Sequence, residues 1–83
     1  MTPTALFTIR FRSGVALPVF NVADAASALR DVRWPDRGSA LHREAVRTAN
    51  EALAGHCKVQ VALNACRKAA ADAGILDSIP SNK

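Results

Sequence analysis

Arginine side chains between residues 33 and 47 supply the clearest candidate binding chemistry in this chain. The candidate contacts with an anion or a nucleic acid are Arg33, Arg37, Arg43 and Arg47. Arg43 and Arg47 are one helical turn apart and therefore share a face, and a helix starting near Ser39 would add unpaired N–H groups. Guanidinium groups bind carboxylates and phosphates in a planar, bidentate geometry. The alternative is an ordinary solvated surface on which nearby carboxylates neutralise the arginines. Those carboxylates are Asp31, Asp36, Glu44 and Glu51.

Residues suited to catalysis or metal binding do not form a set in the sequence. His42, His56, Cys57 and Cys66 have no metal-ligand spacing. Cys57 lies near a predicted helix start, which favours a reactive thiol, whereas Cys66 falls on an apolar stripe and is predicted to be a core residue. Ser39 and His42 are predicted to be a helix cap beside a surface imidazole. We therefore expect no enzyme activity, no metal and no cofactor.

The segment Trp34-Pro35-Asp36-Arg37-Gly38 separates the first predicted helix from the second. Trp34 has a flat, polarisable face that would stack on a base or a ligand ring. The alternative, which we favour, is that Trp34 is a core plug that locks the turn against the first strands. Pro35 and Gly38 then act as structural turn residues, one ending a helix and the other freeing the chain to enter the next.

Alternating apolar residues predict a two-stranded antiparallel hairpin over about residues 5–20. Phe7, Ile9 and Phe11 would share one face of the first strand, and the alternation resumes on the return strand. The residues that resume it are Val15, Leu17 and Val19. Ser13-Gly14 is predicted to be a two-residue turn between the strands. Because two strands alone are marginally stable in water, this apolar face needs a helical cover.

Three helices are predicted after the hairpin, over about residues 22–33, 39–54 and 58–73. Asn21 has the character of an N-cap, and Gly55 and Gly74 are predicted helix stops. The expected core stripes are Val22, Ala25, Ala26, Leu29 and Val32; Leu41, Ala45, Ala49, Ala52 and Leu53; and Val59, Ala62, Leu63, Cys66, Ala70 and Ala73. Residues 77–83 are predicted to be a frayed tail. The expected fold is α+β, with the three helices packed on one face of the hairpin.

The length of 83 residues and the net charge of +4 bound the class of protein. A chain of this length forms one domain, here residues 1–83. No segment is apolar enough to span a membrane and no signal peptide is apparent, so the expected location is the cytoplasm. Much of the apolar content is alanine, which makes a thin core and favours pairing with a second copy.

The turn and the later helices resemble a known family. The positions that carry the resemblance are Trp34-Pro35, Arg37-Gly38, Ala45, Ala52-Leu53, Gly55, Ala62, Ala69-Ala70, Asp72-Ala73 and Ile75. From about Val19 to Ile75 the chain resembles the small bacterial proteins grouped as domain of unknown function 982. The Trp-Pro, Arg-Gly and Ala-Leu-Gly spacing is the most specific part. Leu63 and Cys66 depart from the pattern, which has an arginine and an aromatic residue there. The resemblance implies a fold and no activity.

The function predicted from these observations is a small interaction or regulatory module. Its expected partner is a second copy of the chain or an unidentified protein. The alternative is binding of a nucleic acid or an anionic ligand through the arginines around the Trp34–Gly38 turn. A helix-turn-helix arrangement around Gly55 fits poorly, because the start of the third helix has no arginine to contact a guanine edge.

Overall fold

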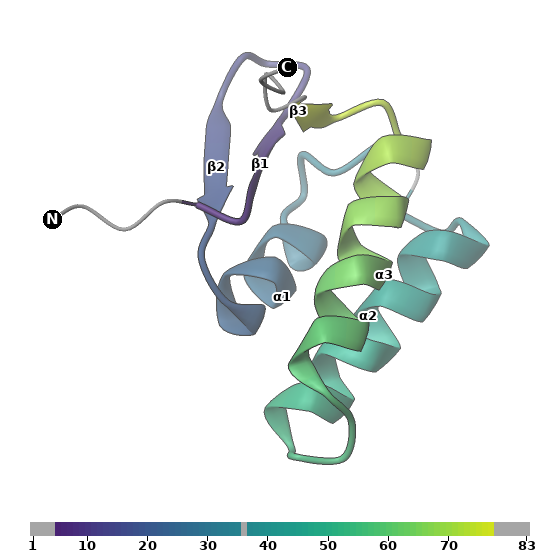
Figure 1. Cartoon of the computed structure of the whole chain (residues 1–83). Helices are drawn as coiled ribbons and strands as arrows, with labels where there is room; N and C mark the ends of the chain where they lie inside the picture. Colours follow the sequence, from purple (N-terminus) through teal and green to yellow (C-terminus); the bar gives the residue numbers. More distant parts are fainter. Residues whose placement is uncertain (1–4, 36, 78–83) are drawn as a thin grey trace, which may run out of the picture.

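Three helices lie on one side of a small antiparallel sheet in the computed structural model, which describes residues 5–35 and 37–77 (Figure 1). The elements in chain order are β1 (Phe7–Arg10), β2 (Ala16–Val19), α1 (Val22–Arg30), α2 (Ala40–Leu53), α3 (Val59–Asp72) and β3 (Leu76–Asp77). This arrangement confirms the predicted α+β fold with an N-terminal hairpin followed by three helices. None of the described helices combines the length and apolar character needed to cross a membrane.

The register in which β1 pairs with β2 differs from the register that the predicted two-residue turn would give. Ile9 lies opposite Leu17, and Phe7 lies opposite Val19. The loop is therefore one residue longer than predicted, and Gly14 adopts a φ of 99°. Opposite residues in an antiparallel pair point to the same face, so this register keeps Leu17 and Val19 on the core side with Ile9 and Phe7, whereas Val15 is exposed. A two-residue turn would shift the pairing by one residue and move the apolar side chains of β2 to the opposite face of the sheet.

A third strand, β3, completes the sheet in the order β2-β1-β3. β3 pairs antiparallel with β1, with Thr8 opposite Asp77 and Ile9 opposite Leu76. The side chains of Arg10 and Asp77 form an ion pair at 3.1 Å beside this pairing. Asp77 was predicted to begin a frayed tail, and that prediction is wrong for Asp77. Residues 78–83 of the predicted tail lie outside the described residues.

Helix α1 begins as predicted and ends early. The side chain of Asn21 accepts the backbone N–H of Asp24, while the carboxylate of Asp24 accepts the N–H of Phe20. The helix stops at Arg30 rather than Arg33 because Asp31 adopts an extended backbone and its carboxylate accepts the N–H of Arg33. Such local side-chain bonds compete with the helix. Val32, predicted to face the core, is instead 81% exposed.

Helices α2 and α3 form an antiparallel pair joined through residues 54–58 (Figure 1). Ser39 caps α2 by accepting the N–H of His42 at 3.1 Å. Both helices end as predicted at a glycine with positive φ, 82° at Gly55 and 75° at Gly74. After Gly74 the N–H of Ile75 bonds back to Ala70, which closes α3 and starts the path into β3.

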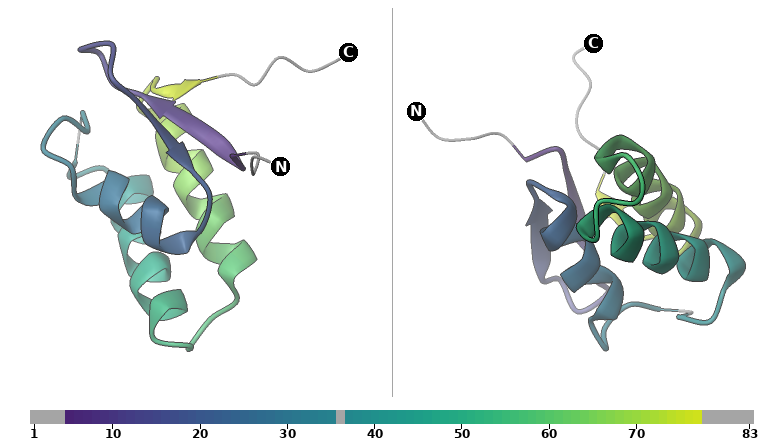
Figure 2. Two further views of the ribbon diagram at one scale, coloured as in Figure 1. Left: turned by 90° about the vertical axis from the view of Figure 1, so that its left-hand side faces the viewer. Right: turned by 90° about the horizontal axis from the view of Figure 1, so that it is seen from below.

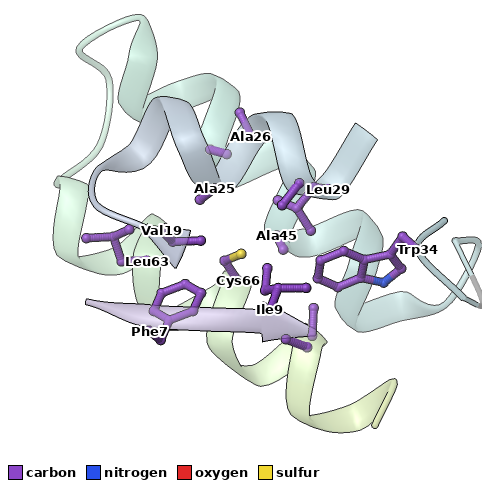
Figure 3. Packing of buried hydrophobic residues seen from close by; sticks show 14 of the residues in the cluster. Phe7, Ile9, Val19, Ala25, Ala26, Leu29, Trp34, Ala45, Leu63 and Cys66 are labelled. Carbon is purple, nitrogen blue, oxygen red and sulfur yellow. The ribbon is translucent and has the colours of Figure 1, made fainter. Parts of the chain in front are cut away.

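The core lies between the sheet and the helices. Helices α1 and α3 contact the strands, and α2 packs against both of these helices (Figure 2). Large side chains from the sheet interlock with alanines from the helices, among them Ala25, Ala26 and Ala45 (Figure 3). Alanine lets these helices lie close together but buries little apolar area per residue. Leu41, Leu53 and Val59 were predicted to face this core and are instead substantially exposed.

Candidate functional site

The indole of Trp34 lies inside the core beside Ile9, Leu29 and Ala45, and only 2% of Trp34 is exposed (Figure 3). Its ring is tilted against the imidazole of His42, with the ring centroids 5.4 Å apart. The buried ring therefore offers no face to a base or a ligand. Pro35 is half-buried and Gly38 is exposed beside it, while Asp36 of the same turn lies outside the described residues.

His42 is buried, so the prediction of a surface imidazole is wrong. Only 6% of the residue is exposed, because the first turn of α2 packs over Trp34 and the end of α1. Its Nε2 lies 2.8 Å from the carbonyl oxygen of Leu29. A carbonyl oxygen only accepts, so Nε2–H is the donor. The other nitrogen, Nδ1, is buried without a hydrogen-bond partner among the described residues.

Arg33 is held by its neighbours. Its guanidinium donates to both carboxylate oxygens of Asp31, at 2.9 and 2.8 Å, and lies 4.8 Å from the ring centroid of Phe11. Hydrogen bonds from the Arg33 side chain and backbone lower the pKa of Asp31 from 3.8 to about 2. The same contact raises the pKa of Arg33. This predicted contact arginine therefore already has a carboxylate partner and an aromatic partner.

Arg47 is held in the same way on α2. It bonds to Glu44 one turn before it and to Glu51 one turn after it, the second contact measuring 2.9 Å. The hydrogen bond that Arg47 donates to Glu44, with the charges of Glu44 and Glu51, raises the pKa of Arg47. Arg47 and Glu51 are four residues apart, a spacing at which two side chains share one face of a helix.

Arg37 and Arg43 are the other two predicted contacts. Both are exposed, and neither forms an ion pair with a described residue. Of the four arginines, two thus hold carboxylates and two lie open near the turn. The structure does not show four available guanidiniums converging on one anion.

A groove between α2 and α3, absent from the sequence-based predictions, is the strongest candidate for a functional surface. Its volume is about 360 Å³. From α2 it is lined by Leu41, Glu44 and Thr48, and from α3 by Val61, Asn64, Ala65 and Lys68. Leu41 is 39% exposed and Val61 is 48% exposed, so apolar surface remains in contact with water. A sequence signal exists, because Val61, Ala65 and Lys68 follow helical spacing one edge away from the core stripe of α3.

The polar residues of the groove differ in how they are engaged. Glu44 is bonded to Arg47, and the hydroxyl of Thr48 donates to the carbonyl oxygens of Glu44 and Ala45. Asn64 accepts a hydrogen bond from Gln60 at 3.1 Å. Lys68 forms no ion pair with any residue that the structure describes. Lys68 is therefore the charged group that the groove offers to a ligand.

The thiols differ in exposure. Cys66 is buried, and burial raises its pKa from 9.0 to about 12, so the thiol stays protonated at neutral pH. Cys57 is half-buried, and its sulfur lies 3.4 Å from the carbonyl oxygen of Thr48. Within residues 5–35 and 37–77, no group of three His, Cys, Asp or Glu side chains could hold a metal ion.

Comparison with known proteins gives one informative result. A family model described as "Protein of unknown function (DUF982)" matches residues 8–77, from β1 to β3. The searches of curated proteins and of solved structures gave no match. The matched range includes β3 as well as the Trp34 turn and both helices of the groove.

Proposed function

The chain belongs to the family described as protein of unknown function (DUF982), and we propose that it is a protein-interaction module whose contact surface is the α2–α3 groove. The observation that carries this proposal is the exposure of Leu41 and Val61 on facing sides of a groove between two helices. Helices α2 and α3 both contribute buried residues to the shared core, which holds the two walls of the groove together. Recognition of a helix in such a groove is a recurring mode of protein binding.

Burial of the apolar surface in the groove would contribute to the free energy of binding, but it is too small to make association permanent by itself. Covering the exposed parts of Leu41 and Val61 would contribute about 2 kcal/mol, given roughly 1.5 to 3 kcal/mol for complete burial of each side chain. A reversible partner of moderate affinity fits this magnitude. Polar groups around the groove would then select the partner.

Binding rather than catalysis is supported by the state of the side chains that usually carry reactions. The imidazole of His42 is buried and bonded to Leu29, and the Cys66 thiol is protonated inside the core. The alternative function, binding an anion or a nucleic acid through the arginines, has less support because Arg33 and Arg47 are already paired.

The test is a quantitative pull-down from the native cell extract with three baits. They are the wild-type chain, Val61→Asp, and the control Val32→Asp, which places the same change at an 81% exposed position outside the groove. Partners retained by the wild type and by the control should be lost with Val61→Asp. Light scattering on the same three proteins tests a second copy as the partner, because an oligomer that uses the groove should dissociate only in Val61→Asp. Capture and oligomeric state that are identical for all three proteins would refute the proposal.

A further inference from the structure

We propose that the groove receives an amphipathic helix of another protein, with acidic residues beside its apolar face. This inference rests on the proposed function and specifies the chemistry of the partner. It depends on one juxtaposition: the apolar side chains of Leu41 and Val61 share a groove with Lys68, and a second hollow beside Lys68 is bordered by Arg67.

The second hollow extends the surface along α3. It has a volume of about 360 Å³ and is lined by Arg67, Ala71 and Leu76, together with Asn64 and Lys68, which also line the groove. Asn64 and Lys68 are one helical turn apart and so form the ridge between the two hollows. A helix lying along α3 would meet apolar side chains on both sides of a ridge that carries a positive charge.

The charge of this surface is positive once internal ion pairs are considered. Lys68 and Arg67 form no ion pair within the described part of the chain, and Arg67 lies 5.9 Å from the ring centroid of Phe7. The one carboxylate of the groove, Glu44, is bonded to Arg47. A partner that brings its own carboxylates would therefore find cations available, whereas a basic partner would be repelled.

Within residues 5–35 and 37–77, a second copy of this chain has few carboxylates left to offer. Among the described residues, ion pairs engage Asp31, Glu44, Glu51 and Asp77. Asp24 is engaged at the start of α1, where it accepts the N–H of Phe20. Asp72 is the remaining described carboxylate. Two copies that met at this surface would bring lysine and arginine together with little to neutralise them, so charge complementarity favours a different protein.

The apolar component distinguishes a helix from a nucleic acid. Leu41 and Val61 gain nothing from a phosphate backbone, which has no apolar groups to cover them. An amphipathic helix supplies apolar side chains at three- and four-residue spacing, and it carries carboxylates on the flanks of the same face. The pattern of apolar surface beside unpaired cations matches such a helix on both counts.

The experiment is a selection from a displayed library of helical peptides about 14 residues long, the length of about four helical turns. Leucine is fixed at helical spacing, and the flanking positions encode Glu, Lys, Gln or Ser with equal frequency. The targets are the wild-type chain, Lys68→Glu, the groove variant Val61→Asp, and the control Lys58→Glu, an exposed lysine of equal charge that lines neither hollow. Circular dichroism verifies that each target is folded.

Peptides selected by the wild type should be rich in Glu at the flanking positions, and the control should select the same peptides. The best of them should bind Lys68→Glu about fivefold more weakly, which corresponds to loss of roughly 1 kcal/mol of ion pairing. Lys68→Glu should shift selection toward Lys. Enriched peptides that are neutral or basic would overturn the acidic partner and leave the interaction module standing. If the wild type enriches no peptide, or if Val61→Asp enriches the same peptides, both the acidic partner and the interaction module are refuted.

A nucleic acid is tested with the same proteins. A short DNA duplex added during selection should displace no more of the acidic peptides than an equal increase in salt concentration does. One result would assign this surface to nucleic acid and overturn the inference. In that result, the wild type binds the duplex and enriches no peptide, and Lys68→Glu abolishes binding of the duplex.

Discussion

His42 and Leu29 join the two helices that flank the Trp34 turn, because the imidazole Nε2–H donates to the Leu29 carbonyl oxygen at 2.8 Å. The last carbonyls of a helix have no partner within it, and a side chain from another element often supplies one. Here the first turn of α2 supplies the donor for the end of α1. The bond lies beside the buried indole of Trp34, so one contact region fixes the turn and both helices.

Replacing His42 with leucine should destabilise the fold by about 1 to 3 kcal/mol, because the buried Leu29 carbonyl loses its donor while the space stays filled. Equilibrium urea unfolding followed by circular dichroism measures the change. The control is His56→Leu, at an exposed histidine, which should stay within about 0.5 kcal/mol of the wild type. Equal stability of the two variants would show that the His42 bond contributes nothing.

Truncation of the core tryptophan, Trp34→Ala, should cost about 3 to 5 kcal/mol, because the change leaves a large cavity in the core. Guanidinium unfolding provides the free energy. Val32→Ala, only two residues away but exposed, should have a small effect. A Trp34→Ala protein as stable as the wild type would contradict burial of the indole.

The two thiols should react at very different rates. With its pKa raised to about 12, Cys66 carries almost no thiolate, so a chromogenic disulfide reagent at about pH 8 should modify Cys57 first. A Cys57→Ser variant isolates Cys66, which should react only after urea is added. Rapid reaction of native Cys57→Ser would show that Cys66 is accessible.

The Asp31–Arg33 pair should give the fold a specific acid sensitivity. The folded pKa of Asp31 is about 2 and the ordinary value is 3.8, so the pair stabilises the fold above about pH 4 and this contribution is lost as the pH falls through 2. Asp31→Asn removes the charge and should flatten the decline in melting temperature between about pH 5 and pH 2. Asp72→Asn, which removes a carboxylate without an ion pair among the described residues, should leave the decline unchanged. Parallel curves for the wild type and Asp31→Asn would contradict this assignment.

The sequence predicted the features that depend on local chemistry. Asn21 caps α1, Gly55 and Gly74 end α2 and α3, and the alternation of β1 is present, because each of these signals lies within a few residues. The resemblance to the family rests on residue types and spacings between Trp34 and Ile75, and the match over residues 8–77 confirms it.

Features that depend on distant partners were missed. Strand β3 consists of only two residues and exists because Ile9 and Thr8 pair with them, which no local pattern encodes. The hairpin loop has the length that keeps Phe7 and Val19 on one face, a requirement of the whole core. His42 was placed on the surface because its burial depends on Trp34 and Leu29, both outside its own helix.

The candidate site was missed for a related reason. Leu41 was assigned to the core stripe of α2. Apolar periodicity identifies the apolar face of a helix, but it does not show how much of that face a neighbouring helix buries. The structure leaves Leu41 and Val61 at the outer edge of the α2–α3 contact. Ion pairs divide the predicted arginine cluster, because Arg33 and Arg47 pair with Asp31, Glu44 and Glu51, three of the carboxylates that the sequence offered as the alternative partners.

The central position of β1 affects how the protein is made. Its partner β2 follows within a few residues, but its other partner is β3, which is translated only after all three helices. Until Leu76 and Asp77 leave the ribosome, one side of β1 presents unpaired backbone groups that a neighbouring nascent chain could bind. The last two residues of the described fold therefore cover this side of β1 only once they have left the ribosome.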